Sequence, residues 1–315
     1  MNNFLDTILS ASFVFSSLRL MTPILFPALG AIVANKAGVP NIGLEGIMLM
    51  SALAGVAGSA FTGIIWMGLL SAILTGVFMA LILAYFTLQL ETDVILGGIA
   101  LNLFASGASI LLLFLMTGDR GSSIALNSGS LPNFDIPIIK NIPFLGEAIS
   151  GHNLLTYVAF LCVILVSYMI KKMPLGMHIR AVGKNPDAAA SVGISVRRTR
   201  YIALLISGAL CGLGGVFLSM GHVSWFSVDM TSGRGWLALA AEAVGRGSVV
   251  GTVLSSMLFG VASAISNVLS LFQAPSELVS TLPFVATVIA LVIYSVLTKK
   301  RQSNPAMQIK RKVKK

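Results

Sequence analysis

The chain has 315 residues, of which 56% are hydrophobic and 10% charged, and its mean hydropathy is +0.91. These values exclude an ordinary water-soluble domain and indicate an integral membrane protein. Apolar stretches of about 20 residues, each long enough to cross roughly 30 Å of hydrocarbon, recur from Leu20 to Leu297. They predict an all-α fold, because the short alternating strands of a membrane β-barrel are missing from the sequence.

The net charge of +10 comes from two clusters of Lys and Arg rather than from a nucleic-acid-binding surface. Seven of the 21 cations lie in 171–200 and eight in a basic tail, 298–315. Because Lys and Arg concentrate on the inner side of membrane proteins, both segments are expected in the cytoplasm, where the tail can contact anionic lipid. The long segment 117–152 holds two cations and is expected outside.

Nine spans are predicted in chain order. Residues 4–17 form either a tenth span or an interfacial helix, because this run is short and contains Asp6. The stretch 236–250 is barely long enough to cross. The predicted spans are about 20–35, 43–62, 64–88, 94–116, 153–170, 201–221, 236–250, 251–272 and 278–297.

Shifting the sequence by 184 residues produces a weak internal match, which predicts a repeat. Leu29-Gly30 falls on Leu213-Gly214, the segment from Ser71 falls on the segment from Ser255, and Thr92-Asp93-Val94 falls on Ser276-Glu277-Leu278. By the predicted topology the two copies, 20–116 and 201–297, run in opposite directions, with 153–170 joining them. This is the plan of an inverted-repeat transporter with its substrate path between the halves. Chance similarity of small and apolar residues is the alternative.

The segment 185–193 predicts a short helix within the basic loop 171–200. Asn185 is a strong N-cap, Pro186 suits the first helical position, Asp187 complements the positive helix end and Gly193 suits a left-handed stop. Two turns are marginal alone, and the small face of Ala188-Ala189-Ala190 allows close approach to a groove in a partner protein. A solvated loop helix is the alternative.

Asp187-Ala188-Ala189 followed by Gly193 resembles the Glu-Ala-Ala-x-x-x-Gly coupling motif of bacterial ATP-binding-cassette importer permeases, with Asp in place of Glu. The longer segments 175–194 and 197–219 resemble the permeases of the branched-chain amino acid, ribose and nucleoside importers. Three further segments, 41–46, 92–102 and 232–240, resemble the nucleoside branch. The resemblance covers about 20–297.

This resemblance implies a permease subunit in a bacterial plasma membrane that imports nucleosides, with ribose-like sugars or branched-chain amino acids as alternatives. The implied partners are a separate ATPase, a second, related but non-identical permease chain and an extracytoplasmic substrate-binding lipoprotein. Coupling to the ATPase would use Arg180, Gly183, Asn185, Pro186, Asp187, Ala188, Ala189 and Gly193.

The chain has no Gly-x-x-x-x-Gly-Lys-Ser/Thr phosphate loop, so it is expected to be no enzyme by itself. An ion-coupled carrier is a second hypothesis, disfavoured because the spans lack a convincing series of carboxylates. A non-transporting sensor is a third, although a sensor would not need two inverted halves. Cys162 and Cys211 lie in apolar runs and predict free thiols, and the three histidines are too scattered for a metal site, so no cofactor is expected.

Polar and aromatic residues near the spans are the candidates for the substrate path. Asn41 is expected to cap the helix that carries Glu45, while an amide in mid-span can recognise a base edge or a ribose hydroxyl, and aromatic rings can stack on a base. Structural alternatives are a Glu45–Lys36 ion pair, an asparagine that bridges helices, and an interfacial aromatic belt. The candidates are Asn41, Glu45, Asn102, Trp225, Phe226, Asp229 and Arg234.

Two further patterns are interpreted as structural rather than functional. The small residues of Gly208-x-x-x-Gly212 predict close helix packing. Glu242 and Arg246 are four residues apart and predict a local ion pair.

Overall fold

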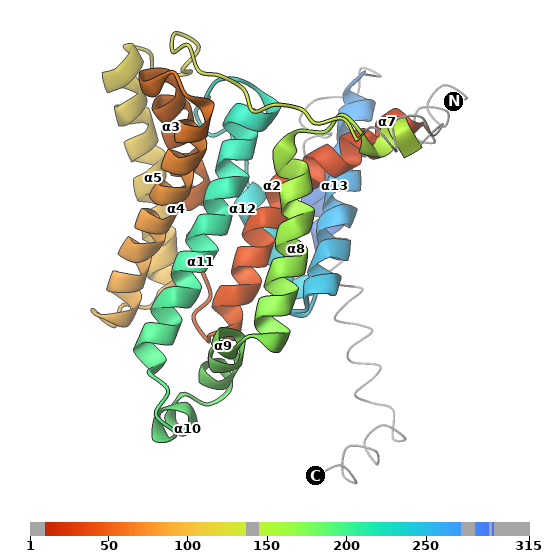
Figure 1. Ribbon diagram of the computed structural model, residues 1–315. Coiled ribbons are helices and arrows are strands. Elements are labelled where there is room, and N and C mark those ends of the chain that lie inside the picture. The colour runs from red at the N-terminus through yellow and green to blue at the C-terminus, as the bar shows by residue number, and fades with distance from the viewer. Residues whose placement is uncertain (1–9, 137–144, 272–280, 290–291, 293–315) are drawn as a thin grey trace.

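The computed structural model describes residues 10–136, 145–271, 281–289 and 292, which form a bundle of helices (Figure 1). Seven described helical segments are long and apolar enough to cross a membrane. The all-α, multi-pass fold is therefore confirmed. The helices are α2 (Ala11–Lys36), α3 (Leu44–Thr62), α4 (Ile65–Leu88), α5 (Val94–Thr117), α7 (Leu145–Ile149), α8 (Leu154–Lys172), α9 (Pro174–Lys184), α10 (Pro186–Ser191), α11 (Val196–Val216), the π-helical turn η1 (Phe217–His222), α12 (Arg234–Val244) and α13 (Val249–Leu271).

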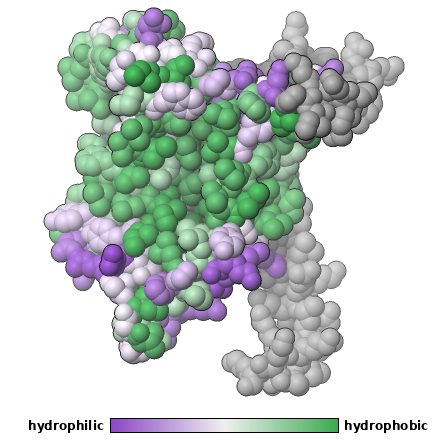
Figure 2. All heavy atoms as spheres, in the orientation of Figure 1, coloured by the Kyte–Doolittle hydropathy of each residue, from purple (hydrophilic) through white to green (hydrophobic). Residues whose placement is uncertain are grey.

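On the face shown in Figure 2, a hydrophobic belt crosses the middle of the molecule, and hydrophilic residues gather above and below it. Residues 117–136 and 171–200 lie at opposite ends of the bundle (Figure 1). We call the end that carries α9 and α10 the basic end. The other end is the strap end, after the strap 119–136 that crosses it.

Hydrogen bonds to the 220–228 segment hold the strap in place. Ser123 N–H donates to the Phe226 carbonyl at 2.8 Å, and Leu131 N–H donates to the Met220 carbonyl at 2.8 Å. At the start of the strap, the backbone N–H of Gly121 donates to Asp119 and lowers the pKa of that carboxyl. The strap therefore packs on the end of η1 instead of extending into solvent.

The predicted spans need two corrections. Residues 11–17 do not form a separate span or interfacial helix, because α2 runs without a break from Ala11 to Lys36. The stretch 236–250 is not a span either: α12 has 11 residues, which is about 16 Å, and the chain turns at Gly245 before α13 begins. Parts of the predicted stretches 4–17 and 278–297 lie outside the described residues, namely 4–9, 278–280, 290–291 and 293–297, while 281–289 is helical.

The inverted repeat is visible where α2 crosses α11. A Cβ atom at Gly30 would lie 2.9 Å from the Ser207 carbonyl oxygen, and one at Gly214 would lie 3.4 Å from the Pro23 carbonyl oxygen. The 184-residue shift maps Gly30 onto Gly214 and Pro23 onto Ser207, so the two contacts are equivalent. Their pairing also shows that α2 and α11 run antiparallel, as the repeat predicts.

Helix boundaries and packing follow the same shift. Helix α4 begins at Ile65 and α13 begins 184 residues later, at Val249. Helix α4 packs on α11, and α13 packs on α2, the counterpart of α11. The third sequence match, at 276–278, lies outside the described residues. The described helices thus fit two inverted copies joined through α8.

Glycine allows a close contact between α4 and α11. Gly76 and Gly208 face each other, so that a Cβ on either would collide with the carbonyl oxygen of the other. One turn along, a Cβ at Gly212 would lie 2.8 Å from the Ala72 carbonyl oxygen. The expected packing role of Gly208-x-x-x-Gly212 is confirmed, as are the free thiols of Cys162 and Cys211.

Candidate functional site

The candidate site is built around the segment between α2 and α3, residues 37–43, which turns back into the membrane layer. We call this segment the break. The break leaves the basic end, where Gly38 contacts Gly183. Three residues later, Asn41 Nδ2 donates to Ser207 Oγ at 2.9 Å. Ser207 lies near the middle of the 27-residue span Val196–His222. Helix α3 therefore begins well inside the membrane rather than at its surface.

Two asparagines hold the backbone of this break. Asn41 is fully buried and its Oδ1 accepts from Gly43 N–H at 3.0 Å. Asn102 on α5 accepts from Gly46 N–H at 2.8 Å and donates to the Ile42 carbonyl at 3.0 Å. These bonds satisfy backbone groups that hydrocarbon could not. The amide of Asn102 thus bridges helices, which is the structural alternative expected for it.

One expectation about the break is corrected. The residue that caps α3 is Gly43, with an ordinary φ of −80°, so Asn41 forms a turn before the helix instead of its N-cap. Glycine is needed at Gly46 for close approach, since a Cβ there would lie 2.9 Å from the Cα of Asn102.

The Glu45 carboxylate joins the two repeat halves. Its Oε1 accepts from Gly233 N–H at 2.8 Å, and its Oε2 accepts from Gly235 N–H at 2.6 Å. Both donors belong to the first turn of α12, which therefore begins at the same depth as α3. The expected alternative partner, Lys36, lies instead near Glu242, whose Oε1 accepts from Asn35 Nδ2 at 2.8 Å.

The remaining path candidates are not gathered on one surface. Trp225 is partly exposed, whereas Phe226 is fully buried under the strap, where its N–H donates to Ser123 Oγ at 2.7 Å. Asp229 is exposed and adopts a left-handed φ of 57° in the loop before α12. Arg234 follows Gly233, but its Nη1 donates to the carbonyls of Met230 and Thr231 on its own segment.

Sequence reasoning did not identify the partners of the break. Ser207 and the N–H groups of Gly233 and Gly235 lie more than 160 residues from Asn41 and Glu45. The alternation Gly233-Arg234-Gly235 was a usable signal, because glycine on both sides of a residue permits close backbone contact. A Cβ at Gly235 would lie 2.7 Å from the Cα of Glu45.

The short helix predicted in the basic loop is confirmed as α10. Asn185 is its N-cap and its Oδ1 accepts from Ala188 N–H at 3.0 Å, with Pro186 at the first helical position. Gly193 follows with a left-handed φ of 84° and nothing within 4 Å of a Cβ position. The signals at both ends of the helix were local, and the structure confirms the expected conformations at Asn185, Pro186 and Gly193.

The face that α10 presents differs from the expected one. Ala189 is 3% exposed and packs within this chain, while Asp187 and Ala188 are exposed. Val192, just past the helix, is 74% exposed. The surface available to a partner is therefore Asp187, Ala188, Ala190, Ser191 and Val192, and Ala189 does not belong to it.

A second helix, α9, was not predicted in this loop. It links α10 to the end of α2, because Gly183 packs so closely that a Cβ there would collide with the Lys36 carbonyl oxygen. Arg200 Nε donates to the neighbouring Ala37 carbonyl at 3.4 Å. Arg180 bonds within α9, to the Gly176 carbonyl. Contacts from α9 and α11 thus fix the start of the break.

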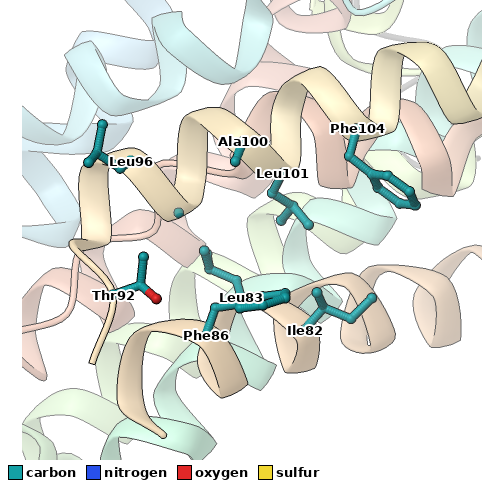
Figure 3. Close-up of a pocket in the computed structure, with 9 residues that line it drawn as sticks. Ile82, Leu83, Phe86, Thr92, Leu96, Ala100, Leu101 and Phe104 are labelled. Atoms are coloured by element: carbon teal, nitrogen blue, oxygen red, sulfur yellow. The ribbon is translucent and has the colours of Figure 1, made fainter. Parts of the chain in front are cut away.

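Two pockets lie beside the break and the strap. The larger, about 550 Å³, lies between α4 and α5 and is lined almost entirely by apolar side chains, among them Leu83, Phe86 and Phe104 (Figure 3). Such a lining offers few partners to a polar substrate. The second, about 430 Å³, lies between strap residues 130–133 and residues 221–225, which include Trp225.

Comparison with known proteins identifies the family of the chain. The sequence matches the family described as branched-chain amino acid transport system / permease component over residues 13–291. It is 31% identical to the nucleoside ABC transporter permease protein NupC of Lactococcus lactis subsp. cremoris, covering 87% of this chain and 89% of NupC. It is also 31% identical to the guanosine ABC transporter permease protein NupQ of Bacillus subtilis, covering 91% of each chain.

A third relative has a different named cargo. The chain is 30% identical to the putative glucose ABC transporter permease protein TsgC13 of Haloferax volcanii, covering 91% of this chain and 92% of TsgC13. All three matches extend over nearly the whole length of both proteins. The chain therefore belongs to the family of branched-chain amino acid transport system permease components and is a permease subunit of an ATP-binding-cassette transporter.

Proposed function

We propose that this permease imports nucleosides. The observation that carries the proposal is the near full-length similarity to two permeases named for nucleoside and guanosine transport, at 31% identity each. The segments 41–46 and 232–240, which resemble the nucleoside branch, meet in space through Glu45, Gly233 and Gly235. A sugar is the second candidate, because TsgC13 is 30% identical.

The cargo is proposed to enter beside Trp225 and to pass the break between the repeat halves. Trp225 offers a partly exposed ring at the strap-end pocket, and an aromatic face can stack on a base. Further in, Asn41, Glu45 and Asn102 set the position of the α3 start. Phe226, Asp229 and Arg234 would act indirectly, by shaping the loop that carries Trp225 and the start of α12.

Uptake by the complete complex tests the substrate. Permease chains, ATPase and binding protein are reconstituted in proteoliposomes, and labelled guanosine, ribose, glucose and leucine are compared with and without ATP on the ATPase side. We expect ATP-dependent uptake of guanosine. Uptake of a sugar or leucine in its place would reject the nucleoside assignment, and guanosine uptake that follows an ion gradient without ATP would favour the carrier hypothesis.

ATPase docking is proposed to use the exposed side of α10. This helix lies at the basic end, furthest from the belt, and is held to the bundle through α9 and Gly183 (Figure 1). Movement of α10 would therefore reach the end of α2, where the break begins. The family implies an ATPase and a second permease chain; we propose that this second chain is related but not identical, and that a lipoprotein delivers the substrate at the strap end.

The membrane orientation is tested by cysteine labelling. Because of the charge bias, the basic end and the tail 298–315 are proposed to be cytoplasmic. In a variant without Cys162 and Cys211, single cysteines at Asn127 and Ser191, both exposed, should react with an impermeant maleimide from opposite sides. Asn127 is preferred to Ser128, whose hydroxyl donates to the Ser224 carbonyl. Labelling of both positions from one side would reject the topology.

A further inference from the structure

Glu45 occupies the point where two helices begin inside the membrane. It is the second residue of α3, and its carboxylate accepts from the first turn of α12. Each helix start has unpaired N–H groups and a partial positive charge, so one carboxylate at this position stabilises both ends. The bonds to Gly233 and Gly235 are 2.8 and 2.6 Å long, which is typical of charge-assisted hydrogen bonds.

The surrounding contacts show that Glu45 and the start of α12 are packed tightly together. Helix α12 is short, and its first turn lies against the backbone of Glu45. The contact is so close that a side chain at Gly235 would not fit. The nearby guanidinium of Arg234 directs its Nη1 to the Met230 and Thr231 carbonyls. The two helices belong to different repeat halves, so Glu45 spans the repeat interface.

In transporters with broken helices, helix starts at the membrane midplane commonly receive an anionic group of the substrate. Here the protein supplies that anion itself. We propose that Glu45 is a positioning residue for transport: its negative charge holds the start of α12 against α3 across the repeat interface, in place of a substrate anion. This inference rests on the proposed transport function, and it assigns to Glu45 no direct contact with the cargo.

The test separates charge from shape in the complete reconstituted complex. Glu45→Gln keeps the size but not the charge, and Glu45→Asp keeps the charge on a shorter side chain. We expect ATP-driven uptake to fall at least about tenfold in Glu45→Gln and clearly less in Glu45→Asp, because hydrogen bonds to a charged acceptor are the stronger ones. Uptake by Glu45→Gln equal to that of the unaltered protein would overturn the proposal.

Chemical rescue provides the second measurement. Glu45→Ala leaves a space that acetate fits, and Glu45 is only partly buried, so a small anion can reach it. Acetate should restore uptake by Glu45→Ala several-fold, whereas the neutral isostere acetamide should not. The matched control is Asn102→Ala, which also removes two bonds to the α3 start but no charge, and should not respond to acetate.

Absence of rescue by acetate, or equal rescue by acetamide, would overturn the role of the charge. Each variant is measured with a substrate that the unaltered complex imports, so a failure of the nucleoside assignment is detected separately, in the unaltered protein. Inserted protein is quantified for every variant, and uptake is expressed per inserted complex.

Discussion

Ala188→Trp is expected to abolish ATP-driven uptake while leaving the permease folded and inserted. Ala188 is exposed on α10, so an indole there can point away from this chain, where it would fill the space of a docked ATPase. Overpacking a fitted contact costs about 1–3 kcal/mol, which is up to roughly a hundredfold in association. Co-purification of the ATPase with the tagged permease, together with uptake, measures the effect.

Two comparisons make this result specific to docking. Asn127→Trp places an exposed indole at the opposite end and should retain the ATPase. Ala189→Trp should instead disturb the seating of α10 on its own chain, because Ala189 is 3% exposed. If Ala188→Trp retains the ATPase and full uptake, α10 does not dock there. Gly193→Val should be milder, because only backbone strain of about 1–2 kcal/mol opposes it.

Gly208→Leu is expected to prevent correct assembly of the bundle. Gly208 lies directly against Gly76, and even a Cβ would collide with the backbone of α4. Separating α4 from α11 would expose or misplace much of the core, so the loss should reach the upper end of the cost of overpacking, about 3 kcal/mol or more. Thermal unfolding of the purified protein in detergent, with the yield of monodisperse material, measures this loss.

The matched control for this substitution is Gly107→Leu. Gly107 is also a helical glycine in a span, but nothing lies within 4 Å of its Cβ position. Leucine there should leave the unfolding temperature unchanged or slightly raised, since glycine is a poor helix former. Equal destabilisation by the two substitutions would show that the tight Gly76–Gly208 contact is not the cause.

Hydropathy and local signals were sufficient for a large part of the description. The belt-crossing helices follow from apolar runs, because a backbone in hydrocarbon must satisfy its own hydrogen bonds. Asn185, Pro186 and Gly193 predicted both ends of α10 because capping depends on residues a few positions apart. The 184-residue shift predicted that α2 and α11 run in opposite directions, and the structure adds that they pack on each other.

The sequence was less informative about burial. Helix α2 is 89% buried within its most apolar window and α5 only 22%, although both are strongly apolar. In a membrane a lipid-facing side chain is as apolar as one in the core, so hydropathy does not distinguish the two faces. For the same reason the apolar stretch 236–250 predicted a span, where the structure has an 11-residue helix and a turn.

By itself, the sequence determined a multi-pass helical membrane protein with an inverted repeat and a short capped helix in its basic loop, because spans and caps depend on neighbouring residues. Its resemblance to importer permeases added the function. Tertiary structure alone decided that Ala189 turns inward, and that Glu45 binds Gly233 and Gly235, 188 and 190 residues away. Such contacts depend on how the helices cross, and a side chain acquires its partner only when distant segments begin at the same depth.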